Sequence, residues 1–342
     1  MTKRKRKLSY QELADRHYKA HESLKLSGSI PNIDIDAAVK NAAIDGRSSS
    51  SKSVLFISDM HVGSIYAVRT PHAVLVDGTE LNPTKLSQQL YDNWCWAKDE
   101  LIQKPDVLCL NGEPVDGSNK KSASAEVWTP SVQTQLKDAE KLIRMYSWKE
   151  IVLTRGSRYH VTVDNTFHEE FLAKTLGCIP YSGFFAQAQE NNNDTKEREV
   201  TPQYTDFYLW FILGGKRFSV CHHVGYNKTE LYRTTALGRE GAVLKFAEGR
   251  WYPKGENVDV IVRSHVHYYV QIKYRHQLSL TTPCWKMPDE FMLRRGLGGT
   301  AVDIGTVEVI IEPNGEIHVY EHIIQNDKYP KPQEINFDER LK

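Results

Sequence analysis

The chain has 342 residues, of which 40% are hydrophobic and 25% are charged, and this composition excludes a wholly disordered, collagen-like or coiled-coil protein. Lysine and arginine number 44 against 43 aspartate and glutamate residues, so no overall positive charge attracts the chain to nucleic acid. No apolar run approaches the ~18 residues that span a bilayer, and the N-terminus lacks the apolar core of a signal peptide. We therefore predict a protein without a membrane partner.

The cysteines also indicate a compartment. Cys95, Cys109, Cys178, Cys221 and Cys284 lie far apart and form no CxxC pair. This spacing favours a reducing environment, without a disulfide framework or a thiolate zinc cluster. We predict a cytoplasmic location, which would be the host cytoplasm if a phage encodes the chain.

Residues 1–52 are predicted to form a basic tail, one short helix and a flexible linker. The first seven residues, MTKRKRK, carry five positive charges and can contact phosphates. Ser9 and Glu12 have the spacing of a capping box, and the helical periodicity extends to Leu24. RSSSSK is typical of a linker. We place the folded domain at 53–325 and a C-terminal tail at 326–342.

Short apolar runs alternate with helical patterns after residue 53. The predicted buried strands are 54–58, 106–110, 151–154, 218–221 and 258–262, and the predicted helices are 84–102, 134–146 and 166–176. This alternation indicates an α/β fold. Two predicted hairpins, 207–213 with 216–221 and 307–312 with 316–324, make the sheet mixed. The polar stretch 189–201 is predicted to be a surface insertion.

Polar side chains follow each of the five apolar runs. They are Asp59 and His61, Glu113 and Asp116, Ser157, Arg158 and His160, His222 and His223, and His265 and His267. The carboxyl ends of parallel strands line one crevice, so these side chains can converge. Alternate residues of an extended segment point the same way, so His265 and His267 can bind one centre.

Imidazoles and carboxylates in one crevice are typical of a metal site. A single DxH motif occurs often by chance, so the ordered set carries the prediction. Imidazole suits zinc, iron, manganese and nickel, and carboxylates can bridge two cations. Two ions ~3.5 to 4 Å apart can activate water and neutralise a phosphoryl group. The sequence therefore predicts a dinuclear site for phosphoester hydrolysis.

In this order, the segments ISDMHVGS, LNGEPVDG, TRGSRYHV, VCHHVG and VRSHVHYY resemble the motifs of the calcineurin-like metallophosphoesterase superfamily. The resemblance covers about residues 53–311. It is closest to members encoded by phages and prophages, on the polar loop LVDGTELNPTK before a Trp-containing helix and on PCWKMPDEFMLRR. It implies a two-sheet mixed β sandwich flanked by helices, in four αββα layers, with two bound divalent ions.

The resemblance also implies roles for individual residues. The implied ligands are Asp59, His61 and His267 for one ion, His222 and His265 for the other, and Glu113 shared by both. Glu113 replaces the Asp of the family and is longer by one methylene, which matters where site geometry is needed within ~0.5 Å. Ser157 replaces an Asn ligand and is a weaker oxygen donor. The ions are Mn, Fe, Zn or Ni, with Mn favoured.

Three further residues are candidates for catalysis. Arg158 stands where the family has a His near the leaving group, and it can bind a phosphate but cannot act as a general acid. His160 can supply that proton if its loop turns inward, and packing within the loop is the alternative. His223 can orient or contact the substrate.

We therefore expect a metal-dependent phosphoester hydrolase, specifically a phosphodiesterase or nuclease that uses metal-bound hydroxide, with nucleic acid or a nucleotide as the substrate. The replacements at Glu113, Ser157 and Arg158 support a different alternative, a catalytically impaired protein that binds phosphate or nucleic acid. A phosphomonoesterase or nucleotide phosphatase is the other alternative.

Overall fold

The computed structural model of the chain describes residues 51–119, 123–163, 166–181, 203–246, 258–275, 277–294 and 302–324. The predicted basic tail and N-terminal helix, the insertion at 189–201 and the C-terminal tail at 326–342 lie outside these residues. The predicted limits of the domain therefore stay a prediction.

Six strands form the first sheet, in the order β15-β14-β1-β4-β5-β8. Their bounds are β1 Lys52–Ile57, β4 Val107–Asn111, β5 Glu150–Thr154, β8 Thr205–Asp206, β14 Gly305–Ile311 and β15 Ile317–Ile323. Strands β1, β4, β5 and β8 pair in parallel, whereas β14 pairs antiparallel with both of its neighbours. The sheet is mixed, and the hairpin predicted at its end, β14 with β15, is confirmed.

Five strands form the second sheet, in the order β12-β13-β11-β10-β9. Their bounds are β9 Tyr208–Leu213, β10 Lys216–Cys221, β11 Val260–Arg263, β12 Val270–Tyr274 and β13 Gln277–Thr281. Strand β11 pairs in parallel with β10 and β13, and β9-β10 and β12-β13 are antiparallel hairpins. The hairpin β9-β10 confirms the prediction, whereas β12-β13 was not predicted.

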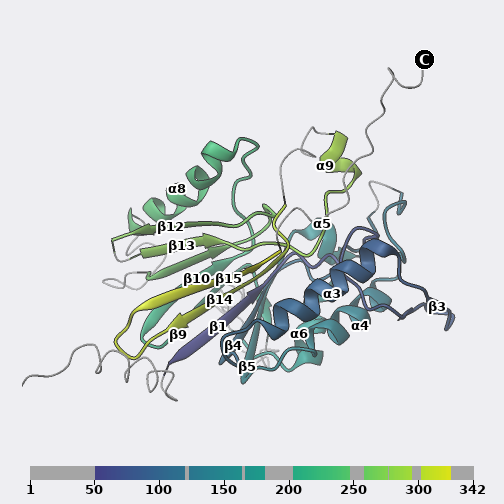
Figure 1. The fold of residues 1–342 in the computed structure, drawn as a ribbon, viewed down its shortest axis with the longest axis horizontal. Helices are drawn as coiled ribbons and strands as arrows, with labels where there is room; N and C mark the ends of the chain where they lie inside the picture. The colour runs from purple at the N-terminus through teal and green to yellow at the C-terminus, as the bar shows by residue number, and fades with distance from the viewer. Residues whose placement is uncertain are drawn as a thin grey trace, which may run out of the picture. The chain divides into compact units, whose positions relative to one another are not determined.

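Helices cover the outer faces of the two sheets (Figure 1). Helices α3 (Lys85–Asp99), α4 (Val132–Ile143) and α6 (His168–Leu176) lie on the first sheet, and α8 (Arg233–Phe246) lies on the second. Between the sheets, Phe56 and Val309 of the first pack with Phe218 and Val262 of the second in one buried cluster. The predicted two-sheet sandwich flanked by helices, in four layers, is confirmed.

Local hydrogen bonds explain where the helices begin. The Thr84 hydroxyl accepts the Ser87 N–H at 3.1 Å, and the Ser87 hydroxyl accepts the Thr84 N–H at 2.9 Å, so α3 begins with a capping box. Ser131 caps α4 in a similar way, by accepting the N–H of Thr134 at 3.3 Å. The helices predicted at 84–102 and 134–146 are therefore present with shifted ends.

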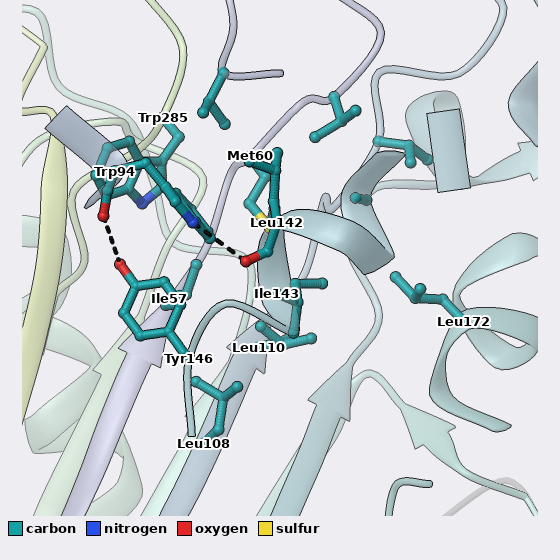
Figure 2. Packing of buried hydrophobic residues seen from close by; sticks show 14 of the residues in the cluster. Ile57, Met60, Trp94, Leu108, Leu110, Leu142, Ile143, Tyr146, Leu172 and Trp285 are labelled. Carbon is teal, nitrogen blue, oxygen red and sulfur yellow. Dashed lines mark hydrogen bonds between the residues drawn. The ribbon is translucent and has the colours of Figure 1, made fainter. Parts of the chain in front are cut away.

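A second buried cluster lies between the helices and the first sheet, and it supports the loop after β1 (Figure 2). Trp94 of α3 donates its Nε1–H to the Leu142 carbonyl of α4 at 3.2 Å and lies edge-on to Trp285, with ring centroids 4.7 Å apart. The Trp285 N–H donates to the Asp59 carbonyl at 3.0 Å. Met60 belongs to the same cluster, so the core anchors the backbone at Asp59 and at the residue that follows it.

Shorter elements complete the described part of the fold. They are β2 Ala73–Val74, β3 Glu80–Leu81, α5 Arg158–Val161, β6 Thr162–Val163, β7 Thr166–Phe167, the 3-10 helix η2 Glu230–Tyr232 and α9 Glu290–Arg294. Within the described ranges, no helix has both the length and the apolar character needed to cross a membrane.

Candidate metal centre

The predicted site residues lie directly after five strands, at one end of the sandwich. The first sheet supplies the residues that follow β1, β4 and β5, and the second sheet supplies those that follow β10 and β11. The structure brings all seven predicted ligands close to one another: Asp59, His61, Glu113, Ser157, His222, His265 and His267. Each sheet thus contributes part of the site.

One group of possible ligand atoms combines Asp59, His61, Glu113 and His267. His61 Nε2 lies 3.0 Å from Glu113 Oε2 and 3.8 Å from Asp59 Oδ1. His267 Nε2 lies 3.3 Å from the same oxygen of Asp59 and 3.3 Å from His61 Nε2. Two carboxylate oxygens and two imidazole nitrogens therefore face a common point, which is a donor set that suits a divalent transition metal.

A second group combines Glu113, His222 and His265. Glu113 Oε1 lies 3.3 Å from His222 Nε2 and 4.0 Å from His265 Nδ1. The other carboxylate oxygen of Glu113, Oε2, faces His61 in the first group. Glu113 thus contributes one oxygen to each group, which is the arrangement that a carboxylate shared by two ions requires.

The backbone at the ligands has an unusual conformation. Asp59, His61, Glu113, His265 and His267 all have positive φ, between 46° and 72°, a region that costs a non-glycine residue energy and occurs often at functional sites. His265 and His267 therefore do not form the extended segment that the spacing predicted. They also fall in different groups of possible ligand atoms.

In two places, a single apolar and buried residue separates two proposed ligands in the chain. Met60 between Asp59 and His61 is 1% exposed, and Val266 between His265 and His267 is 2% exposed. The left-handed turn on each side of the apolar residue lets it enter the core while both neighbours face the site.

Several ligand atoms are buried without a hydrogen-bond partner in the described part of the chain. They are Asp59 Oδ1, His222 Nε2 and His265 Nδ1, and all three face the other ligand atoms of the two groups. An unsatisfied buried polar atom is costly. Bound cations would satisfy all three atoms, so the residues present fit a metal centre.

Charge coupling sets the protonation of these groups. Burial lowers the pKa of His222, but the carboxylates of Glu113 and Asp59 outweigh it and raise that pKa to about 10. Burial lowers the pKa of His265 to about 4. Burial raises the pKa values of Asp59 and Glu113, but the charge of His222 outweighs it and lowers both. Without metal, the protonated His222 compensates the two buried carboxylates.

Asp116 supports the first group from behind. Its Oδ1 accepts the Nδ1–H of His61 at 3.0 Å and contacts the buried Lys286 Nζ at 3.2 Å. Asn119 donates its Nδ2–H to the other oxygen at 3.3 Å. A carboxylate on Nδ1 leaves Nε2 of a histidine available for a metal ion and increases its basicity.

The remaining predicted residues lie around the groups. The Ser157 hydroxyl donates to Glu113 Oε1, and Arg158 is exposed at the start of α5, with its guanidinium 5.9 Å from the Phe167 ring. His160 donates its Nδ1–H to the Asp116 carbonyl at 2.9 Å. His223 is exposed and stacks on His265, with ring centroids 4.4 Å apart.

Sequence reasoning missed three supporting residues. Asn111 accepts the Nδ1–H of His222 on its carbonyl at 2.7 Å, and its position directly before Gly112 at a strand end was a usable signal. Glu169 accepts the N–H groups of Glu113 and Gly156 at 3.1 and 2.9 Å. Lys286 pairs with Asp116. No local motif marks Glu169 in the sequence, and Lys286 lies in the segment PCWKMPDEFMLRR, which indicates no role for it.

Comparisons with known proteins find similar solved structures. No family model and no curated protein matches the sequence. A novel archaeal phosphodiesterase is 11% identical, with 79% of this chain and 99% of that one covered and a TM-score of 0.34. YfcE, a phosphoesterase from E. coli, is 13% identical, with 78% and 98% covered and a TM-score of 0.34. Vps29 from Entamoeba histolytica in complex with zinc is 10% identical, with 79% and 98% covered and a TM-score of 0.32.

The resemblance to phage-encoded members stays a prediction.

Proposed function

We propose that the chain is a metal-dependent phosphoester hydrolase of the calcineurin-like metallophosphoesterase type, with two divalent ions at this centre. The position of Glu113 is the observation that carries this proposal, because its two oxygens face two different groups of buried donors. Among the described residues, Asp59 Oδ1, His222 Nε2 and His265 Nδ1 make no hydrogen bond, and bound cations would give each of these buried atoms a partner.

The two groups define the proposed ligands. Asp59, His61 and His267 would hold one ion, His222 and His265 the other, and Glu113 both. Mixed nitrogen and oxygen donors suit Mn, Fe, Zn or Ni, and we favour Mn. Bound ions would supply charge neutralisation of a phosphoryl group and acidification of water.

Residues at the edge of the groups would handle the substrate. The exposed Arg158 adjoins Ser157, which contacts Glu113, and its guanidinium can bind two phosphoryl oxygens. His223 stacks on the proposed ligand His265, so its exposed ring can contact the same phosphate.

His160 is suited to accept a proton. Its Nδ1–H is donated to the Asp116 carbonyl, so Nε2 is the atom that can take up a proton. Burial lowers the pKa of His160, which keeps Nε2 unprotonated at neutral pH. This favours a proton acceptor over the donor role that the sequence suggested.

The finer proposal is that the substrate is a phosphodiester in nucleic acid. Its support is the basic segment MTKRKRK, which lies outside the described residues and could contact phosphates next to the scissile one. A nucleotide is the smaller substrate with the same chemistry.

Metal content and hydrolysis test the proposal together. The protein is stripped with chelator, reloaded with Mn²⁺ and analysed for bound metal, and then assayed with bis-p-nitrophenyl phosphate, p-nitrophenyl phosphate and a single-stranded oligonucleotide. We expect close to two ions per chain and faster cleavage of the diesters than of the monoester. Glu113→Ala should remove at least one ion and most of the activity.

His72→Ala is the matched control, because the His72 side chain is 64% exposed and pairs with Glu80, which belongs to neither group. This variant should keep both ions and full activity. A wild-type protein that binds no divalent ion would overturn the proposal. Two bound ions without hydrolysis of any substrate would favour the catalytically impaired binding protein.

A further inference from the structure

Ser157 directs two hydrogen bonds to one oxygen of Glu113. Its backbone N–H donates to Glu113 Oε1 at 3.1 Å, and its hydroxyl donates to the same oxygen. This oxygen is also the one that lies 3.3 Å from His222 Nε2. The direction in which Glu113 faces the second group therefore depends on Ser157.

The backbones of the two residues are held at a fixed separation. Glu169 Oε1 accepts the N–H of Glu113 at 3.1 Å and the N–H of Gly156 at 2.9 Å, so one buried carboxyl group joins both loops. A Cβ on Gly156 would lie 2.4 Å from Glu113 Cγ. The Glu113 side chain thus fills the space that the glycine leaves, and little room remains for another position of its stem.

We propose that Ser157 is a positioning residue, which acts through Glu113 and is not itself a metal ligand. This inference deepens the proposed function and rests on it for the role of the metal. A neutral hydroxyl is a weak ligand compared with imidazole or carboxylate, and the hydroxyl proton of Ser157 is given to Glu113. The long Glu113 side chain has more rotamers than Asp, and the two donors select one of them.

The first test uses the metal-free protein. Removing the hydroxyl in Ser157→Ala should lower the melting temperature by roughly 3 °C, because a hydrogen bond to a buried charge is lost. In the background of Glu113→Ala the same substitution should change the melting temperature by less than about 1 °C, because its partner is gone. Equal losses in both backgrounds would overturn the proposal.

The second test measures binding of the two Mn²⁺ ions by titration. We expect Ser157→Ala to lower the affinity for the ion at the second group by about 10–100-fold, as for other residues that orient a ligand. The affinity for the ion at the first group should change much less. Ser157→Thr keeps the hydroxyl and should bind both ions within about threefold of wild type. Equal weakening of both ions would contradict an effect that acts through Glu113 Oε1.

The third test asks whether an atom of residue 157 reaches the metal. Ser157→Cys, which replaces the oxygen with a strong metal-binding sulfur, is loaded with Co²⁺. We expect no thiolate-to-cobalt charge-transfer band, and such a band would place residue 157 among the ligands and overturn the proposal. If wild type bound no ion but the metal-free coupling was present, the hydrolase proposal would fall and the positioning of Glu113 by Ser157 would stand.

Discussion

His222 donates its Nδ1–H to the carbonyl oxygen of Asn111 over 2.7 Å. A carbonyl oxygen can only accept, so this bond keeps a proton on Nδ1 and leaves Nε2 to face Glu113 Oε1 at 3.3 Å. A backbone atom of the first sheet thus determines which nitrogen of a second-sheet histidine is available to a metal ion.

Metal affinity should rise with pH. Burial lowers the pKa of His222, but Glu113 and Asp59 outweigh it and raise that pKa to about 10. A bound ion must displace this proton, so each unit of pH gained below 10 should strengthen binding by up to about tenfold. Titration with Mn²⁺ at about pH 6, 7 and 8 measures the slope. His222→Ala should bind more weakly and lose the slope, and an equal affinity of wild type at all three values would contradict the prediction.

Asp116→Asn should lower the affinity for the ion at the first group by about 10–100-fold, because Asp116 orients His61 through a hydrogen bond from Nδ1. The matched control is Asp289→Asn. Asp289 is the other carboxylate on Lys286, at 2.9 Å, and no described contact joins it to His61 Nδ1. Its loss should leave both affinities within about twofold of wild type. Calorimetric titration of the two variants distinguishes support of His61 from a general effect of unpairing Lys286.

Glu169 should make the metal-free protein less stable as the pH rises. Burial raises its pKa to about 8 despite the N–H groups of Gly156 and Glu113, against an ordinary value of 4.5. Between these values the folded state holds a proton that the unfolded chain has lost. The contribution to stability is therefore complete below about pH 4.5 and declines as the pH rises to about 8.

The variant Glu169→Gln tests this prediction, since its amide oxygen still accepts an N–H group. Wild type should lose stability as Glu169 titrates, whereas the variant should not. The free energy of unfolding of the variant minus that of wild type should therefore increase by on the order of 1–3 kcal/mol as the pH rises from about 5.5 to 8. Urea denaturation in the presence of chelator gives both values. A constant difference between variant and wild type would show that Glu169 does not titrate in this range.

Gly156→Ala should disturb both the fold and the metal groups. The added Cβ would lie 2.4 Å from Glu113 Cγ and 2.7 Å from its backbone nitrogen, so the free energy of unfolding should fall by about 1–3 kcal/mol and Mn²⁺ should bind more weakly. Gly238→Ala in α8 is the control, because its added Cβ would lie 3.7 Å from Ile272 Cδ1, an ordinary van der Waals contact. The free energy of unfolding of Gly238→Ala, measured by denaturation, and its affinity for Mn²⁺, measured by titration, should equal or exceed those of wild type.

The strands that carry the site could be predicted because they are buried on both faces. Strands β1 and β11 are almost fully buried, and such strands are continuous apolar runs in a sequence. Strand β12 lies at a sheet edge, and its exposed residues include Gln271, Lys273 and Tyr274. Its sequence, VQIKY, contains polar residues and is not a continuous apolar run, so the same criterion did not predict it.

The composition of the site could be predicted, but not its backbone. Ligand types at successive strand ends are visible in the sequence, whereas the left-handed φ values of Asp59 and His265 are marked by no glycine. Tertiary contacts hold these conformations, as when the His265 N–H donates to Asp59 Oδ2 at 3.2 Å. Glu169 and Lys286 escaped prediction for the same reason, because their partners are distant in the chain.

The division of the ligands between two sheets has a mechanical consequence. Asp59 and His267 of the first group come from different sheets, as do Glu113 and His222 of the second. Each bound ion would therefore act as an inorganic cross-link that closes a very long loop of the chain, the kind of closure that restricts an unfolded chain most. The end of the sandwich that carries the ions would be clamped, while the strand ends farthest from them would stay free to slide apart first.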